Sequence, residues 1–310
     1  MKTVFLDRKS ISESLDLSGF EKFGEFVTYD LSTPEEIPGR VKDADIIVVN
    51  KAPINEKTVG IAENLKLVCV TATGTNNLDK DYLDSKGIEW RNVAGYSTDS
   101  VAQHTFAMLF YLLEHLPYYD EYVKSGKYAA NPIFTHHGRP FNEIAGMKWG
   151  IIGLGTIGRK VAQIASAFGA EVRYYSTSGK NHTNDYKEVS FDELLLTSDI
   201  ISIHAPLDDN TLHLIDAAAL KKMKKSAILL NVGRGPIIVE EDLKNALDEG
   251  EIAAAGLDVL TEEPMSKDSP FLKVKYPERL LVTPHIAWAS LEAEDRLMSS
   301  VLKQIEEFVH

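Results

Sequence analysis

Three residues capable of chemistry follow short apolar runs in the second half of this 310-residue chain. Arg234 lies between two glycines, and an arginine on such a tight loop suits the bidentate capture of a carboxylate. Glu263 and His285 follow the next two apolar runs. Taken singly, a lone histidine is usually structural and a loop glutamate is usually solvated. Because all three come in this order at the ends of predicted parallel strands, where such sheets bind ligands, we interpret them as a catalytic set.

A glycine motif lies upstream of these residues. The spacing G-x-G-x-x-G covers Gly153, Gly155 and Gly158, directly after a predicted strand and before a predicted helix. The first glycine permits a tight turn, the second lets the backbone approach a pyrophosphate, and the third lets the helix touch the strand. The amides of Thr156 and Ile157 then face the phosphates at the positive end of the helix. In this context the motif predicts a dinucleotide-binding site.

The position that usually selects between NAD and NADP departs from the common pattern. An acid about 20 residues after the glycines normally binds the ribose hydroxyls. Here Ser176 and Thr177 follow the second strand, and Asp185 comes too late in the chain. Without a carboxylate nothing repels a 2′-phosphate, and Lys180 either attracts one or is a solvated loop residue. The sequence therefore leaves NAD and NADP both open.

Composition and charge narrow the class of protein. A net charge of −13 argues against nucleic-acid binding, which requires a basic face. The one cysteine, Cys69, lies in an apolar run, so no intrachain disulfide can form and we expect a reducing, cytoplasmic location. The N-terminus is charged and no apolar run approaches the ~20 residues that span a bilayer, so we expect no signal peptide and no membrane segment. The histidines are scattered without metal-ligand spacing, so no metal is expected.

Short strands alternating with helices must position these residues. The expected strands are at 3–6, 26–29, 46–49, 67–71 and 88–92 in the first half, and at 147–152, 172–175, 200–204, 227–231, 255–259 and 281–283 in the second. Four-residue apolar runs of this kind are typical of buried parallel strands. Together with the length, the alternation predicts an α/β protein with a doubly wound Rossmann sheet and a second, flavodoxin-like α/β domain. A long apolar helix is expected at 101–123 and a last helix at 291–309.

Taken in order, the motifs resemble those of the D-isomer-specific 2-hydroxyacid dehydrogenase family, and the resemblance covers essentially all 310 residues. The segments 96–102 and 285–290 look most like the glycerate dehydrogenase, or hydroxypyruvate reductase, branch. Two departures are Ser176 in place of the usual aspartate and Gln103 where a glutamate is common. The matching motifs are G-x-G-x-x-G at 153–158, His-Ala-Pro-Leu at 204–207, Asn-Val-Gly-Arg-Gly at 231–235, Leu-Asp-Val at 257–259 with Glu-Pro at 263–264, and Pro-His at 284–285.

This resemblance implies a reaction and a role for each catalytic residue. The reaction is hydride transfer between NAD(P)H and a small 2-keto acid, with hydroxypyruvate giving D-glycerate or glyoxylate giving glycolate. Arg234 would fix the substrate carboxylate and carbonyl, His285 would be the acid–base, and Glu263 would hydrogen-bond to His285. A histidine gives up and regains a proton near neutral pH, as such a reduction requires.

The rest of the site also follows from the resemblance. Backbone amides around Thr73 and Gly74 would hold the carboxylate of the substrate. Lys51 is a candidate for holding the same anion, and Tyr96 and Trp288 are candidates for the pocket wall, although these three can equally be surface or packing residues. The expected cofactor contacts are Gly153, Gly155, Thr156, Ile157, Gly158, Ser176, Thr177, Lys180, His204, Pro206, Val232, Gly233 and Asp258.

The family resemblance also implies domain boundaries, a cofactor and an oligomeric state. Residues 1–98 and 288–310 would form the substrate domain, and residues 99–287 the dinucleotide-binding domain. NAD is the default cofactor of the family, and a homodimer through the helical region at 101–123 is expected.

Three alternatives compete with this interpretation. One is a dehydrogenase of larger D-2-hydroxy acids, because pocket shape is not readable from sequence. Another is a non-catalytic nucleotide-sensing corepressor on the same fold, which the intact Arg234, Glu263 and His285 disfavour. A short-chain dehydrogenase would need a Tyr-x-x-x-Lys after the glycine motif, whereas Tyr82 and Lys86 come before it.

Overall fold

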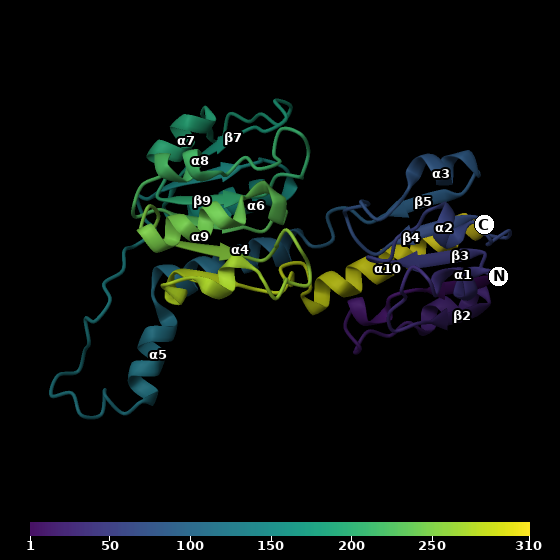
Figure 1. Cartoon of the computed structure of the whole chain (residues 1–310), viewed down its shortest axis with the longest axis horizontal. Coiled ribbons are helices and arrows are strands. Elements are labelled where there is room, and N and C mark those ends of the chain that lie inside the picture. The colour runs from purple at the N-terminus through teal and green to yellow at the C-terminus, as the bar shows by residue number, and fades with distance from the viewer. The chain divides into compact units, whose positions relative to one another are not determined.

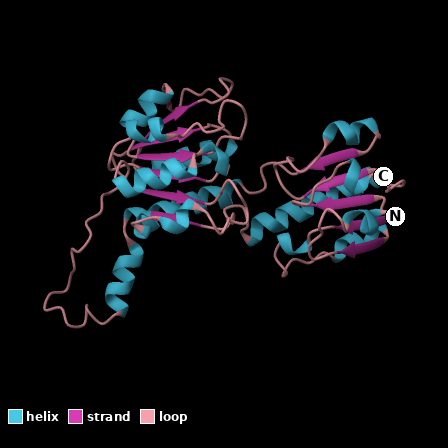
Figure 2. Ribbon diagram, in the orientation of Figure 1, coloured by secondary structure: helices cyan, strands magenta, loops and turns pink.

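Two compact units make up the chain in a computed structural model that describes all residues 1–310. The first unit comprises Met1–Ser97 and Trp288–His310, and the second comprises Thr98–Ala287. Each has a wholly parallel sheet with helices on its faces, as Figures 1 and 2 show. The predicted class, α/β with two parallel sheets, is confirmed.

The first unit has the strand order β2-β1-β3-β4-β5, which is the flavodoxin-like order. Its strands are β1 (Lys2–Phe5), β2 (Glu25–Thr28), β3 (Ile46–Val49), β4 (Leu67–Val70) and β5 (Glu89–Asn92). Its helices are α1 (Ile37–Val41), α2 (Glu56–Val59), α3 (Lys80–Ser85) and α10 (Leu291–Val309), with 3-10 turns at Arg8–Ser10 and Ser18–Phe23.

Both faces of this first sheet are buried at its central strands, which is why β3 and β4 are apolar at every position rather than at alternate ones. Ile47 and Val49 face the core under α1, α2 and α3. Ile46 and Val48 face the core on the opposite side of the sheet. Helix α10, from the C-terminal end of the chain, packs over that core. Residues 288–310 therefore complete the hydrophobic core of the first unit.

The second unit has the strand order β12-β11-β10-β9-β6-β7-β8. Its strands are β6 (Lys148–Ile152), β7 (Glu171–Tyr175), β8 (Lys187–Glu188), β9 (Ile200–Ile203), β10 (Ile228–Asn231), β11 (Ala254–Leu257) and β12 (Leu280–Val282). Its helices are α4 (Thr98–Leu113), α5 (Leu116–Lys124), α6 (Thr156–Ala167), α7 (Phe191–Thr197), α8 (Ala217–Lys222) and α9 (Glu240–Glu249), with 3-10 turns at Gly235–Ile237, Pro270–Lys273 and Pro277–Arg279.

The order of strands in this second sheet reverses between β6 and β9. From β6 the chain runs outward to β7 and β8, and then returns to β9 on the other side of β6. Helices α4 and α6 pack on one face, and α7, α8 and α9 pack on the other. Ligands of doubly wound sheets bind at the carboxyl ends of the strands beside such a reversal. A ligand is therefore expected at the loops that follow β6 and β9.

The long helix expected at 101–123 is two helices. Its first part, α4, ends at Leu113, and α5 begins at Leu116. His115 adopts a left-handed conformation with φ 52°, and Pro117 supplies no N–H to continue the ladder. The break turns α5, so that this helix and the loop after it extend away from the sheet (Figure 1).

Candidate active site

The glycine motif forms the turn between β6 and α6. Gly153 has φ 90°, and a Cβ there would lie 2.8 Å from the backbone N of Ala205. A Cβ on Gly158 would lie 2.3 Å from the Gly153 carbonyl oxygen, so only glycine allows the helix to approach the strand. Gly155 by contrast has no atom near its Cβ position, which leaves its backbone open to a ligand. No side chain caps α6, so the N–H groups of its first turn are available to an anion.

These features fit the pyrophosphate of a dinucleotide. A helix N-terminus with unpaired amides and an adjacent glycine of open approach is the arrangement that binds such phosphates. Gly153, Gly155, Thr156, Ile157 and Gly158 therefore stand together, as the motif predicted, beside the reversal of strand order between β6 and β9.

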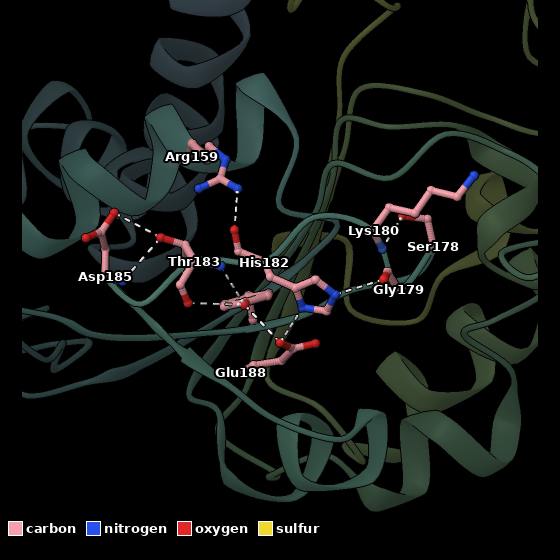
Figure 3. A network of polar contacts seen from close by, with 9 residues as sticks. Arg159, Ser178, Gly179, Lys180, His182, Thr183, Asp185 and Glu188 are labelled. Atoms are coloured by element: carbon pink, nitrogen blue, oxygen red, sulfur yellow. Dashed lines mark hydrogen bonds and ion pairs between the residues drawn. The ribbon is translucent and has the colours of Figure 1, made fainter.

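A network of polar contacts orders the loop after β7 (Figure 3). The His182 ring lies 2.8 Å from the Glu188 carboxylate through Nδ1 and 2.8 Å from the Gly179 carbonyl oxygen through Nε2. Both partners accept hydrogen bonds, so both ring nitrogens must carry protons. The hydrogen bond that His182 donates to Glu188 accordingly raises the pKa of His182. Arg159 of α6 donates to the His182 carbonyl oxygen at 3.1 Å, which ties the loop to the glycine-motif helix.

The predicted ribose-selecting residues lie at the beginning of this loop. Ser176 is 9% exposed, and its hydroxyl has no hydrogen-bond partner in the chain. Lys180 is exposed, and its side chain points away from the network (Figure 3). Asp185 accepts from the Thr183 hydroxyl at 2.9 Å, so it is engaged within the loop. No carboxylate occupies the end of β7.

The His204 ring is directed into the protein. The indole N–H of Trp149 donates to Ser202 Oγ at 2.9 Å, and His204 Nε2 lies 2.9 Å from the same oxygen. Burial lowers the pKa of His204 to about 3, so the ring is neutral. The His204 ring therefore contacts side chains of the sheet. In the His-Ala-Pro-Leu motif at 204–207, Pro206 is the exposed residue.

A buried asparagine shapes the loop that carries Arg234. Asn231, 1% exposed, accepts from the Gly233 N–H at 3.0 Å and donates to the Arg234 carbonyl oxygen at 2.9 Å. The guanidinium donates through Nη1 to the Gly233 carbonyl oxygen at 2.8 Å, and its other nitrogens form no hydrogen bond or ion pair within the chain. A Cβ on Gly235 would overlap the Leu260 carbonyl, so the loops after β10 and β11 pass in close contact.

His285 and Glu263 form the shortest ion pair of this edge. Nδ1 of His285 lies 2.6 Å from Glu263 Oε2, and the Leu260 N–H donates to the other carboxylate oxygen at 2.9 Å. Facing a carboxylate, Nδ1 must carry a proton, which leaves Nε2 as the nitrogen for exchange. His285 has φ 55°, an uncommon backbone conformation for a non-glycine residue.

Asp258 holds the loop that carries His285. Its side chain is 1% exposed and accepts from the N–H groups of Ile286 and Ala287, each at 2.9 Å. Thr283 Oγ1 also donates to it at 2.7 Å, and His104 lies 3.0 Å from that hydroxyl. Both carboxylate oxygens are engaged, so Asp258 fixes the loop that carries His285. Its predicted contact with the cofactor stays a prediction.

The first unit presents a different kind of group at the carboxyl edge of its sheet. The loop after β4 is held at Thr73, whose hydroxyl donates to the Val93 carbonyl oxygen at 3.0 Å, while Asn92 donates to the Thr73 carbonyl oxygen at 2.6 Å. The backbone N–H groups of residues 73–77 donate no hydrogen bond within the chain. Successive unpaired amides of this kind suit an anion. Thr73 and Gly74 were predicted here; the bracing by Asn92 was not.

The other predicted substrate residues of this unit differ in exposure. Lys51 is exposed at the end of β3. Tyr96 is 8% exposed and meets the Trp288 ring edge-on at 6.3 Å between centroids, within the core under α10. Their rings are packing residues of the first unit, which was the alternative left open for them.

Metal ligands, membrane-spanning helices and the single thiol are the remaining groups of functional interest. No cluster of three or more His, Cys, Asp or Glu side chains is arranged to bind a metal ion. None of the helices has both the length and the apolar character needed to traverse a bilayer. Burial raises the pKa of the Cys69 thiol to about 12, so it is not a nucleophile.

Comparison with known proteins agrees with this geometry. Residues 106–287 match the family described as D-isomer specific 2-hydroxyacid dehydrogenase, NAD binding domain. A hydroxypyruvate reductase of Blautia hydrogenotrophica is 39% identical, over 100% of this chain and 97% of that protein. A solved acyclic imino acid reductase in complex with NADPH and D-Arg is 30% identical with a TM-score of 0.87, over 100% of this chain and 97% of that one. A D-lactate dehydrogenase from Aquifex aeolicus, complexed with NAD and lactic acid, is 27% identical with a TM-score of 0.86, over 99% and 95%.

Proposed function

The chain belongs to the D-isomer specific 2-hydroxyacid dehydrogenase family, and we propose that it reduces small 2-keto acids, hydroxypyruvate or glyoxylate in particular, to the corresponding 2-hydroxy acids. The observation that carries this proposal is the pair of His285 and Glu263 at 2.6 Å, on a strand edge that also bears Arg234. Strands β10, β11 and β12 are neighbours, so the loops that follow them meet at one edge.

Each catalytic side chain has a defined task in this reduction. When bound, the nicotinamide supplies a hydride to the carbonyl carbon of the substrate. His285 gives the proton on Nε2 to the carbonyl oxygen and keeps the proton on Nδ1, which Glu263 holds. In the reverse direction the neutral Nε2 takes the hydroxyl proton.

Arg234 binds the substrate rather than exchanging a proton. A guanidinium stays charged and offers a planar fork to a carboxylate or carbonyl oxygen. One of its nitrogens is used to fix its own loop, so the side chain is oriented before the substrate arrives. Much of the rate is then expected from positioning.

Local cations and amides must attract the substrate, because the chain as a whole repels anions. Its net charge is −13. We assign the carboxylate of the substrate to the amides around Thr73 and Gly74, with Lys51 as the additional charge. Support comes from the unpaired N–H groups of residues 73–77 and from the exposure of Lys51.

The cofactor is held by the glycine motif and the loops after β7, β9 and β10. We propose that both NADH and NADPH are accepted, because Ser176 brings no charge to the ribose and Lys180 pairs with no carboxylate. Ser176→Asp should raise the KM for NADPH relative to that for NADH by about tenfold or more, since like charges repel. Ser176→Asn, polar but uncharged, is the control. An unchanged ratio of the two KM values in Ser176→Asp would remove this position from cofactor selection.

We further propose that two chains form a homodimer. Its interface was expected at 101–123, but the apolar side chains of α4 are largely buried within their own unit, so we assign the interface to the segment 116–147 instead. α5 and its loop expose a set of large apolar side chains that a monomer would leave in water: Leu116, Val123, Ile133, Phe134 and Phe141, between 47% and 89% exposed. The loop is ordered within the chain, since the His136 ring stacks on Tyr122 at 3.7 Å and bonds to the Tyr118 hydroxyl at 2.7 Å. Light scattering should give the mass of two chains, and Phe134→Ser together with Ile133→Ser should shift it toward one.

The buried cysteine and the nicotinamide cofactor are also consistent with a reducing, cytoplasmic location, which we include in the proposal.

The reaction itself is tested with purified protein. NADH and NADPH are each crossed with hydroxypyruvate, glyoxylate, pyruvate and phenylpyruvate, and cofactor absorbance is followed. We expect turnover with hydroxypyruvate or glyoxylate, and slower turnover with phenylpyruvate. Dinucleotide binding without turnover on any of the four acids would instead support a nucleotide sensor.

A further inference from the structure

A buried carboxylate lies at the carboxyl end of β1 in the first unit. Asp7 is 4% exposed, and it accepts hydrogen bonds from three consecutive backbone N–H groups of the loop after β3. The Asn50 N–H lies 2.9 and 3.0 Å from the two oxygens, the Lys51 N–H lies 2.6 Å from Oδ2, and the Ala52 N–H lies 3.1 Å from Oδ2. The two segments are neighbours because β1 pairs with β3.

Burial of the Asp7 carboxylate costs free energy unless hydrogen bonds replace those it would make to water. A carboxylate removed from water must be well supplied with hydrogen bonds. Burial raises the pKa of Asp7, and the three amides oppose that effect by stabilising the charged form. Three successive amides converging on one anion form the same kind of nest that binds external anions. Here the chain fills the nest itself, so these amides serve to hold the loop and not to bind a substrate.

The loop is fixed at its far end as well. The Asn77 side chain donates to the Ala52 carbonyl oxygen at 3.0 Å, and the Ile54 N–H donates to the Asn77 carbonyl oxygen at 2.8 Å. Lys51 is therefore the exposed residue of a loop whose backbone is pinned on both sides. An ammonium on a four-carbon stem gains directional binding only if its backbone is held.

The second unit uses the same device. Asp258 is 1% exposed, and it accepts from the consecutive N–H groups of Ile286 and Ala287, next to His285. In both units, then, a buried aspartate in the loop after one strand holds the backbone of a loop at the carboxyl edge of the same sheet, beside Lys51 in the first unit and His285 in the second. The recurrence shows that the chain uses a buried carboxylate to fix a loop at a strand edge.

We propose that Asp7 is a positioning residue for substrate binding, which acts by fixing the loop of residues 50–52 so that the ammonium of Lys51 receives the carboxylate of the keto acid. The inference rests on the proposed reductase function. Asp7 itself touches no substrate. Its carboxylate determines the direction from which Lys51 presents its charge.

The first test is Asp7→Asn in the full-length enzyme. The amide keeps the size of the side chain but loses the negative charge and one of the two acceptor oxygens, so the N–H groups of residues 50–52 are left with a single neutral acceptor. We expect the KM for hydroxypyruvate to rise about tenfold, as for the loss of a charge-assisted interaction, while the KM for the cofactor stays unchanged and kcat changes less than about threefold. A purely structural role would lower stability without separating KM from kcat in this way.

A matched control is Asp45→Asn in the same unit. Asp45 accepts from the Lys2 N–H at 2.7 Å at the opposite, amino-terminal edge of the sheet. This variant removes one structural carboxylate far along the strands from Lys51. We expect a lower melting temperature and an unchanged KM for hydroxypyruvate.

The decisive comparison is a double-mutant cycle with Lys51→Met. If Asp7 acts through Lys51, then Lys51→Met alone should raise the KM, and Asp7→Asn should raise it no further in that background. Independent, additive effects would overturn the proposal, as would an unchanged KM in Lys51→Met. If Asp7→Asn does not fold, Asp7→Glu replaces it, since one added methylene displaces the acceptors while keeping the charge. An inactive wild-type protein would refute the proposed function instead, so the two failures are distinguishable.

Discussion

The two units present different chemistry at the carboxyl edges of similar parallel sheets. The second unit offers side chains that exchange protons or bind anions, namely His285 paired with Glu263, and Arg234. The first unit offers backbone N–H groups of residues 73–77 and the lysine at position 51. Backbone amides bind anions but cannot shuttle protons near neutral pH. We therefore expect substitutions that remove the functional groups of the second unit to lower kcat, and substitutions that remove those of the first unit to raise KM.

His285→Gln gives the largest expected effect. Glutamine offers an amide N–H to the Glu263 carboxylate but has no proton to give to the substrate. General acid–base catalysis is worth about 10²–10⁴ in rate, so kcat for hydroxypyruvate should fall within that range with little change in KM. Steady-state kinetics would check this, with cofactor fluorescence to confirm dinucleotide binding. A kcat within a few-fold of wild type would show that another group supplies the proton.

Arg234→Lys tests whether every functional residue of the second unit affects kcat rather than KM. Arg234 belongs to the second unit, but its task is binding. An ammonium keeps the charge and loses the planar fork, so we expect KM to rise roughly 10- to 100-fold, as for a lost charge-assisted hydrogen bond, with a smaller change in kcat. Wild-type KM in this variant would contradict the assignment of Arg234 to substrate binding.

Glu263→Gln should lower kcat less than His285→Gln does. The two carboxylate oxygens of Glu263 accept from Nδ1 of His285 and from the Leu260 N–H. A glutamine has only one acceptor oxygen, so it cannot accept from both groups and no longer holds the ring in one orientation. We expect kcat for hydroxypyruvate to fall roughly tenfold, as for the loss of a charge-assisted hydrogen bond, with little change in KM. Steady-state kinetics would check this, and a wild-type kcat would remove Glu263 from the mechanism.

Gly74→Pro is expected to have the smallest effect and to fall on KM alone. Proline removes one N–H from the run of unpaired amides in the first unit, while Gly74→Ala keeps it and serves as the control. Loss of one hydrogen bond to a carboxylate should raise KM roughly tenfold. An equal loss in the alanine control would mean that loop shape, and not the N–H donor, is responsible.

Side-chain chemistry was more predictable from sequence than backbone chemistry. Arg234, Glu263 and His285 stand out because their residue types and their places after apolar runs carry the information. The parallel sheets and the glycine turn follow from local patterns in the same way. Strand β8 was missed because Lys187 and Glu188 are exposed and show no hydrophobic pattern.

The positioning residues could not be found from sequence because their partners are distant in the chain. Asp7 acts on amides more than 40 residues away, and which amides it meets depends on the register of β1 against β3. The role of Asp258 in holding the loop was missed for the same reason, since nothing local reveals that the N–H groups of Ile286 and Ala287 donate to its two oxygens. Similarly, the direction of the His204 ring depends on the neighbouring Trp149 and Ser202, which only the folded sheet brings together.

The most direct test of the account is the oxidation of glycerate, measured as the formation of NADH or NADPH with each enantiomer separately. A D-isomer specific 2-hydroxyacid dehydrogenase with His285 as its base should oxidise D-glycerate and leave L-glycerate unreacted, and His285→Gln should abolish the reaction with the D-isomer. Oxidation of the L-isomer, or full activity of His285→Gln on D-glycerate, would contradict the account.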